Sequence, residues 1–570
     1  MKTRKITGIL MLAALFVFAS CDENKFLEED PRAIYVIENS LTTVSDFQAA
    51  ANMMYRKITE VLSNSNDGGV FALYHGTDLA LCTSSFDQLN TYKATMVPEN
   101  GLVLYNWRNT YYVINQANMI LARLEAADIP SANKNAFRGE ALFFRAFGYR
   151  ILGHLYGGVP LITEEITAPR FDFVRATRTE VYTQAKDDLV EAVSLLENIE
   201  DLADGKISKQ MANHLLAEIY ISLGEYDNAI SAATAVINHP TMRLMTERFG
   251  TKLSQPGDVY SDLFRAGNLN RKNSGNTESL WVRQYQYLNP ASNLGDAWHW
   301  KWNPMYDAIT ITVDGVTTTA FKGCTAEKGG RSVAWMSPTD YMVWGVWEND
   351  PNDMRVSEYN VTRDFVIDND DSPAFGKWLV ADGFATTLIR RQWFNFYAWK
   401  VTGDVPTDFY RRDANGDPLL TAFGETLVIN DASQAFKDLY YCRLAETYLL
   451  RAEAHLGKND RQAAANDINV IRSRANVSLA SASEIDIDYI LDERMRELYY
   501  EETRMITLCR LGKLAERNRK YNVNYTDYTG TYECAGTSIE DYHNLWPIPF
   551  TEIDRNTEAK LEQNPGYVVR

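Results

Sequence analysis

The sequence predicts a mainly α protein: a scaffold of helix–turn–helix repeats with an irregular, loop-rich lobe inserted between two helical blocks. Three observations support this prediction. Apolar residues recur at helical spacing near both ends of the chain, and small residues mark two pairs of antiparallel helices. Between about residues 241 and 435 the helical periodicity fades, while Gly, Pro, Asn and Asp become frequent.

The N-terminus has the pattern of an export signal. Cations at positions 2, 4 and 5 precede the apolar run Ile6–Phe18, which is too short to span a bilayer. Small residues then lead directly to Cys21 and a polar stretch. This pattern resembles a bacterial lipoprotein signal, so we expect residues 1–20 to be removed and Cys21 to be lipidated, which anchors a chain without a spanning helix. An ordinary secretory signal is the alternative.

The N-terminal helical block, residues 21–240, begins with three amphipathic helices. Their apolar faces are Phe47, Ala51, Met54, Ile58 and Leu62; Trp107, Tyr111, Ile114, Asn118 and Leu121; and Phe137, Ala141, Phe144, Ile151 and Leu155. Gly157, Gly158 and Pro160 end the third helix.

The clearest repeat lies at residues 213–240. Its small and aromatic residues match the spacing of a tetratricopeptide unit: Leu216, Ala217, Tyr220, Gly224, Tyr226, Ala229, Ala233 and Pro240. A related order recurs from Tyr448 to Ala475, followed by a predicted helix from about Asp488 to Glu516. Units of this kind stack into a solenoid, which serves either as a binding surface or as a plain scaffold.

The lobe at residues 241–435 contains two turn signals. Ile309–Thr317 has Asp-Gly between β-prone runs and predicts a hairpin, and Asn415-Gly416 predicts a second tight turn. Around that turn, Asp413–Asp417 resembles a calcium loop, but Pro418 stands where the loop needs Gly. We therefore interpret it as a turn.

Ten of the 12 tryptophans lie between residues 281 and 399, where a uniform share would be two or three. Trp298, Trp300 and Trp302 alternate, so an extended conformation would place three indoles on one face. Flat aromatic rings suit the apolar faces of sugars. We expect part of this cluster to line a binding surface, and Trp281 to be core.

Known metal, nucleophile and phosphate motifs are missing from the sequence, and the seven histidines are scattered, so no metal or cofactor is expected. The net charge of −18 disfavours nucleic acid as a partner. Five widely spaced cysteines follow Cys21, an odd number that does not form a disulfide framework, although one pair remains open. We expect most of them to be buried.

Several separated segments resemble the SusD/RagB family of surface glycan-binding lipoproteins. They are Cys21–Pro31, Trp107–Asn118, Glu140–Leu161, Arg443–Ala475, Glu493–Arg510 and Leu545–Tyr567. The charged residues of the fourth and fifth segments alternate in sign at helical spacing, so we expect them to pair across helices. Trp546-Pro547-Ile548-Pro549 should run extended because proline disfavours helix in the residue before it.

The resemblance implies a tetratricopeptide-like scaffold, no enzymatic activity, an outer-membrane location facing the cell exterior, and a SusC-type TonB-dependent transporter as partner. We also expect residues 436–570 to form a second helical block that packs with the first as one unit. It also places the ligand where a loop at residues 64–100 meets the lobe. The residues expected there are Asp67, Phe86, Asp87, Tyr92, Tyr285, Tyr287, Trp298, Trp300, Trp302, Trp335 and Arg390.

Three alternatives remain open at this point. The cargo could be a peptide instead of an oligo- or polysaccharide. The chain could also be a surface glycoside hydrolase, because the two carboxylates that such an enzyme needs have no fixed sequence spacing. A purely structural assembly protein is the third alternative.

Overall fold

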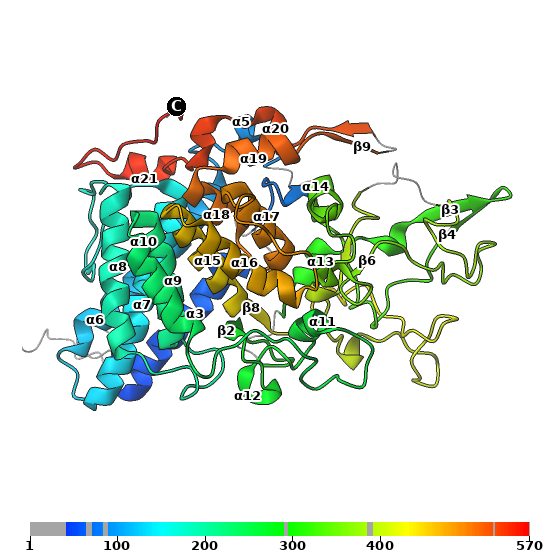
Figure 1. Ribbon diagram of the computed structural model, residues 1–570, viewed down its shortest axis with the longest axis horizontal. Coiled ribbons are helices and arrows are strands. Elements are labelled where there is room, and N and C mark those ends of the chain that lie inside the picture. Colours follow the sequence, from blue (N-terminus) through cyan, green and yellow to red (C-terminus); the bar gives the residue numbers. More distant parts are fainter. Residues whose placement is uncertain are drawn as a thin grey trace, which may run out of the picture.

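A computed structural model describes residues 41–63, 71–83, 89–289, 295–384, 391–527 and 530–568. Helices dominate it, as predicted (Figure 1). The longer ones are α3 (Val44–Ser63), α6 (Gly101–Leu124), α7 (Ser131–Tyr156), α8 (Arg178–Leu195), α9 (Lys209–Leu223), α10 (Tyr226–Ile237), α15 (Leu444–Gly457), α16 (Arg461–Arg474), α17 (Ile487–Leu498), α18 (Arg504–Leu511) and α19 (Leu514–Tyr521). The apolar faces predicted for the first three long helices are turned into the core.

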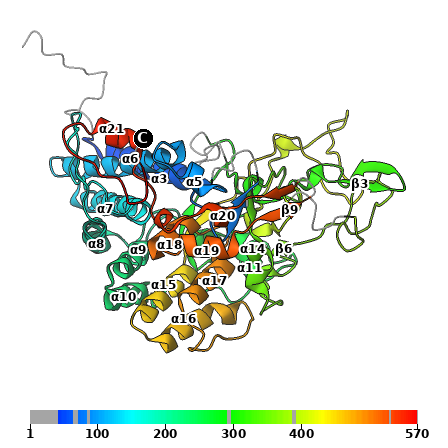
Figure 2. The ribbon, with the colours of Figure 1, turned by 90° about the horizontal axis from the view of Figure 1, so that it is seen from above.

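The long helices pack in chain order across both blocks. Helix α7 packs on α8, α8 on α9, α9 on α10, and α10 on α15, which pairs with α16. Figures 1 and 2 show the resulting layer of antiparallel helices, in which α15 continues the row that α6 to α10 begin. The two halves of the chain therefore build one tetratricopeptide-like array.

Close packing explains the small residues of the repeat. Helix α9 ends at Gly224, which has a left-handed φ of 75° that a side chain would strain. At the end of α15, a Cβ on Gly457 would lie 2.4 Å from the ring of Tyr226 at the start of α10. Glycine at this position lets α10 and α15 approach each other.

The single helix predicted from Asp488 to Glu516 is wrong. The structure divides the segment into α17, α18 and part of α19, with Tyr500 at φ 62° and Gly512 at φ 65° in the two breaks. The first break turns the ring of Tyr500 onto Trp302 of the lobe, with centroids 3.9 Å apart. Packing between scaffold and lobe thus overrides the local helix preference.

The inserted lobe contains short helices and two-stranded sheets. The helices are α11 (Val259–Phe264), α12 (Arg271–Ser274), α13 (Trp298–Trp302) and α14 (Asp340–Val343), and the strands are β2 (Ser279–Arg283), β3 (Thr310–Val313), β4 (Val316–Thr319), β5 (Met336–Pro338), β6 (Val361–Thr362) and β7 (Tyr397–Ala398). The predicted hairpin is β3–β4, with Asp314 and Gly315 at positive φ. The second predicted turn also forms, since Asp413 Oδ1 accepts the backbone N–H groups of Asn415 and Asp417.

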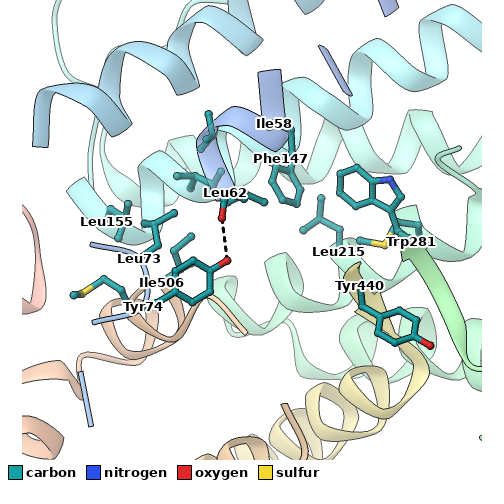
Figure 3. Close-up of a cluster of buried hydrophobic side chains, with 14 of the residues drawn as sticks. Ile58, Leu62, Leu73, Tyr74, Phe147, Leu155, Leu215, Trp281, Tyr440 and Ile506 are labelled. Atoms are coloured by element: carbon teal, nitrogen blue, oxygen red, sulfur yellow. Dashed lines mark hydrogen bonds between the residues drawn. The ribbon is translucent and has the colours of Figure 1, made fainter. Parts of the chain in front are cut away.

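Elements from outside the lobe hold it against the scaffold. Strand β2 pairs with β8 (Leu439–Arg443), and β5 pairs with β1 (Ala80–Cys82). The C-terminal part adds β9 (Tyr525–Asp527), β10 (Gly530–Tyr532), α20 (Ala535–Ser538) and α21 (Phe550–Arg555), and α5 (Tyr92–Thr95) packs on α20. Figure 3 shows the core at this junction, where Tyr74 donates a hydrogen bond to the carbonyl of Leu62, and the predicted core residue Trp281 is buried.

Buried ion pairs link α17 to α16, to strand β8 and to the lobe. The Glu497 carboxylate of α17 contacts Arg443, Arg474 and Arg355, and Arg443 also contacts Glu278, with Nη1–Oε1 2.7 Å. Burial by itself raises the pKa of the Glu497 carboxyl, but the three guanidinium groups hold it far below its usual range. The charges of the fourth and fifth family segments therefore pair across helices, as predicted.

A second buried group joins the first block to the last helices. The Asp78 carboxylate accepts hydrogen bonds from Arg504 Nη2 and Arg517 Nε, both at 2.7 Å.

The segment Trp546–Pro549 is extended, as predicted. Trp546 donates its backbone N–H to the carbonyl of Leu155 at the end of α7, with 2.6 Å between N and O.

The five cysteines in the described residues are free thiols; four are buried and Cys442 is partly buried. Among the residues described, no helix has both the length and the apolar composition needed to cross a membrane. Cys21 and the signal pattern lie outside the described residues.

Candidate ligand-binding surface

The loop before α6 meets the lobe at the β1–β5 pair. Ala80 lies opposite Pro338 and Cys82 opposite Met336. Thr83 extends the pairing by donating its backbone N–H to the carbonyl of Trp335, with 3.0 Å between N and O. This junction is where the family resemblance placed the ligand.

Two indoles form an aromatic pair at the junction. Trp300 of α13 and Trp335, just before β5, have ring centroids 4.4 Å apart and planes inclined by 55°. The edge of Phe71 supports Trp335, with centroids 5.7 Å apart. A backbone hydrogen bond from Val333 to the carbonyl of Trp300 ties the two segments together. Both indoles are partly exposed, so the pair offers inclined apolar faces to a ligand.

Residues 298–302 are not extended, which was the condition for placing all three indoles on one face, because they form helix α13. Residues four apart share one side of a helix, so Trp298 and Trp302 point together into the core, while Trp300 lies on the other side. Trp298 Nε1 donates to the carbonyl of Tyr500, and Trp302 stacks on the Tyr500 ring. Of the three indoles, only Trp300 contributes to the surface.

Tyr92 must also be removed from the candidate surface. Its ring is fully buried, and its hydroxyl donates to the carbonyl of Gly76, with 2.6 Å between the oxygens. The two other tyrosines of the prediction lie just beyond the end of β2. Tyr287 donates to Asp408 Oδ2 at 2.6 Å and packs against Phe436, while partly buried Tyr285 donates its backbone N–H to Asp438.

Four of the predicted residues, Asp67, Phe86, Asp87 and Arg390, lie outside the described residues. Their assignment to the surface stays a prediction. Thr83 and Arg391, which flank two of these gaps in the chain, both lie beside β5 through hydrogen bonds to the carbonyls of Trp335 and Pro338.

Arg391, a weaker candidate from the sequence, forms part of a second aromatic group whose tyrosines the sequence analysis did not identify. Its Nε donates to the carbonyl of Pro338 at 3.0 Å and its Nη1 to Asp340 Oδ1 at 2.7 Å, which fixes the guanidinium over the Tyr525 ring. Tyr525 in turn stacks on Tyr532 across the β9–β10 hairpin. This hairpin lies beside α14 in both Figure 1 and Figure 2.

Further rings surround α14. Tyr341 stacks on Tyr521 with centroids 3.6 Å apart, and Trp344, 60% exposed, lies under the guanidinium of Arg363. The recurrence of tyrosine at positions 521, 525 and 532 is the sequence signal for this group, and it lies outside the tryptophan-rich lobe. We call Trp300, Trp335, Arg391, Tyr341 and Tyr525 the aromatic surface.

Buried charge supports the floor beneath this surface. Asp296 Oδ1 accepts the backbone N–H of Trp298, the first residue of α13, at 2.9 Å. Burial raises the pKa of the Asp296 carboxyl to about 6. The Arg283 guanidinium lies against the rings of Trp298 and Tyr441, 5.1 Å from each centroid. These contacts hold Trp298 and, through helix α13, position Trp300.

A helical-repeat scaffold whose inserted lobe presents fixed aromatic faces is the architecture of a ligand-binding protein. Two family models match the chain: one described as "SusD family" over residues 345–567, and one described as "Starch-binding associating with outer membrane" over residues 25–221. The chain belongs to the SusD family.

Curated relatives agree with this assignment. "SusD-like protein P2" of Formosa agariphila is 25% identical over 586 residues, covering 100% of both chains. "Starch-binding protein SusD" of Bacteroides thetaiotaomicron is 34% identical over 139 residues, which cover 24% of this chain and 23% of that protein.

Solved structures share the fold. A "Laminarin binding SusD-like protein" matches with TM-score 0.63 and 20% identity, covering 92% of this chain and 99% of that one. A SusD homolog from Bacteroides thetaiotaomicron matches with TM-score 0.66 and 19% identity, covering 93% and 98%.

Proposed function

We propose that the protein is a cell-surface lipoprotein that binds an oligo- or polysaccharide at the aromatic surface and passes it to a SusC-type TonB-dependent transporter. The Trp300–Trp335 pair is the observation that carries the proposal. Two inclined indoles present flat apolar faces to sugar rings, and relatives of this chain are named for binding starch and laminarin.

The aromatic surface also offers polar groups at its edge. The Arg391 guanidinium and the Asp340 carboxylate are paired with each other beside β5, in reach of groups that approach the Tyr525 ring. Stacking provides affinity for any sugar face, whereas hydrogen bonds to such polar groups select among hydroxyl patterns. We propose that binding occurs without bond cleavage, as the family resemblance implies.

Calorimetry against a panel of soluble glycans tests the binding proposal. Starch, laminarin and other soluble polysaccharides are titrated into the mature chain and into a Trp300→Ala/Trp335→Ala variant. We expect affinity for one glycan class and its loss in the variant. Trp378→Ala is the matched control, because Trp378 is a lobe tryptophan that is 49% exposed and lies outside the aromatic surface. Equal affinity in all three proteins would contradict the site.

Two further measurements discriminate the alternative functions. Product release from a bound oligosaccharide, measured by chromatography after long incubation, would favour a hydrolase. Binding of peptides but no glycan would favour peptide cargo.

The proposed lipid anchor and transporter partner are tested separately. We expect Cys21→Ser to move the protein from the membrane fraction to the soluble fraction, and the wild-type chain to co-purify with an outer-membrane barrel.

A further inference from the structure

Three side chains of the types that bind metals meet where α9, β8 and α15 come together. His214 of α9, Cys442 of β8 and Glu446 in the first turn of α15 place one donor atom each within 4.8 Å of one another. Because His214 belongs to the first helical block and the other two to the last, no local spacing of residues indicates the group.

Neighbouring groups orient two of these three side chains. His214 Nδ1 shares a hydrogen bond with Thr447 Oγ1 at 2.8 Å, so its Nε2 faces Glu446 Oε2 at 3.8 Å. The other carboxylate oxygen of Glu446 is held by Arg494, with Nη2–Oε1 2.5 Å. Partners of this kind fix the tautomer and the direction of metal ligands in known sites.

The three side chains supply three kinds of donor atom. An imidazole nitrogen, a thiol sulfur and a carboxylate oxygen match the N, S and O ligands that zinc takes. A bound divalent cation would displace the thiol proton, which leaves to solvent, and the Cys442 thiolate and Glu446 carboxylate would balance the charge of the ion.

The distances fit after a small contraction. Ligand atoms around a tetrahedral zinc lie roughly 3.3–3.8 Å apart, given bonds of about 2.0–2.3 Å. All three residues line an internal cavity of about 40 Å³, which has room for a water molecule as fourth ligand. Figure 3 shows Leu62, Tyr74, Phe147, Leu215 and Tyr440, which also line this cavity.

Two of the nearby cations are paired with carboxylates. Arg150, which lines the same cavity, forms two 2.9 Å hydrogen bonds with the Glu218 carboxylate, and Arg494 is shared between Glu446 and Glu502. These carboxylates reduce the repulsion of a metal ion by Arg150 and Arg494. Arg283 also lines the cavity and has no ion pair among the described residues, so its charge opposes the binding of a cation.

We propose that His214, Cys442 and Glu446 bind one zinc ion that fastens α9 to the β8–α15 junction. The site would be structural, because its three residues belong to scaffold elements and none of them is part of the aromatic surface. It would stabilise the contact between the two halves of the helical array.

Metal content and cobalt spectroscopy test this proposal. Tag-free mature protein is unfolded with a chelator and refolded with excess Zn²⁺ or Co²⁺, and loose metal is removed by dialysis. We expect about one ion per chain, a raised melting temperature relative to chelator-treated protein, and a near-ultraviolet thiolate-to-cobalt charge-transfer band. The band should disappear in Cys442→Ser and persist in Cys534→Ser, the control at another buried free thiol.

Wild-type protein that refolds with less than about 0.1 ion per chain overturns the proposal, as does a cobalt band that survives in Cys442→Ser. If Cys442→Ser does not fold, His214→Gln replaces it, since it keeps the thiol and removes the nitrogen ligand. The wild-type measurement decides the question independently of either variant.

Discussion

Trp300 and Trp335 face each other with ring centroids 4.4 Å apart, one from helix α13 and the other from the approach to strand β5. The Phe71 ring supports the pair from the loop before β1. A ligand that stacks on these indoles would touch the lobe directly above the point where it joins the scaffold. The predictions below separate the residues that present this surface from those that hold it.

Replacing Trp335 should weaken glycan binding, whereas replacing Trp302 should lower the stability of the fold. Trp335→Ala removes a partly exposed stacking face, so we expect glycan affinity to fall about tenfold, equivalent to about 1.4 kcal/mol, with little change in stability. Trp302→Ala empties a fully buried site and should lower the free energy of unfolding by about 3–5 kcal/mol. Calorimetry and urea denaturation measure the two effects; a folded Trp302→Ala protein with lost affinity would contradict this division.

Glu497→Gln should destabilise the fold strongly. The carboxylate contacts Arg355, Arg443 and Arg474 in the core, so its loss removes one carboxylate partner from each of three buried guanidinium groups. We expect a cost of about 3–5 kcal/mol, measured by urea denaturation. Glu562→Gln is the matched control at the exposed pair with Lys560 and should leave the midpoint unchanged. Equal midpoints for the two variants would mean that the buried network contributes little.

Stability should fall in acid over a defined range. Burial alone raises the pKa values of Glu493 and Asp78, but neighbouring arginines outweigh it and bring each to about 2, from ordinary values of 4.5 and 3.8. Because these folded-state values are depressed, the stabilisation is complete above about pH 4.5 and is lost as pH falls toward 2. Urea midpoints measured across this range should drop steeply. Glu493→Gln should make the drop shallower, and an unchanged slope would count against this assignment.

Gly457→Ala should separate α10 from α15. The added methyl group would meet the Tyr226 ring at 2.4 Å, so we expect a loss of about 1–3 kcal/mol from overpacking. Gly101→Ala, at the start of α6, has open space around the new methyl group and should be neutral or slightly stabilising. Thermal denaturation compares the two; equal melting temperatures would show that Tyr226 moves aside without cost.

The scaffold was predictable because its signals are local and repeated. Apolar spacing identified the faces of α3, α6 and α7, and the small residues near Gly224 identified the repeat. Asp314-Gly315 fixed the hairpin through its own backbone preferences. Each of these features depends on residues within one helix or one turn.

The aromatic surface was predictable only in part. Alternating tryptophans at 298–302 fit a strand face, but residues 298 and 302 also fit one side of a helix, and five residues cannot distinguish the two periods. Burial of Tyr92 depends on contacts with Gly76 and Ser538, which no local pattern encodes. The His214–Cys442–Glu446 group was likewise not predictable from local patterns, because its members come from three separate elements.

The ion pairs of Asp78 constrain the order in which the molecule can assemble. Its two arginine partners occur 426 and 439 positions later in the chain. Burying the Asp78 carboxylate without its partners would cost several kcal/mol. The segment around β1 therefore cannot reach its folded position until Arg517 is present in the chain. A growing or partly translocated chain therefore lacks a finished junction between scaffold and lobe, and the aromatic surface becomes complete only when nearly all of the polypeptide is present.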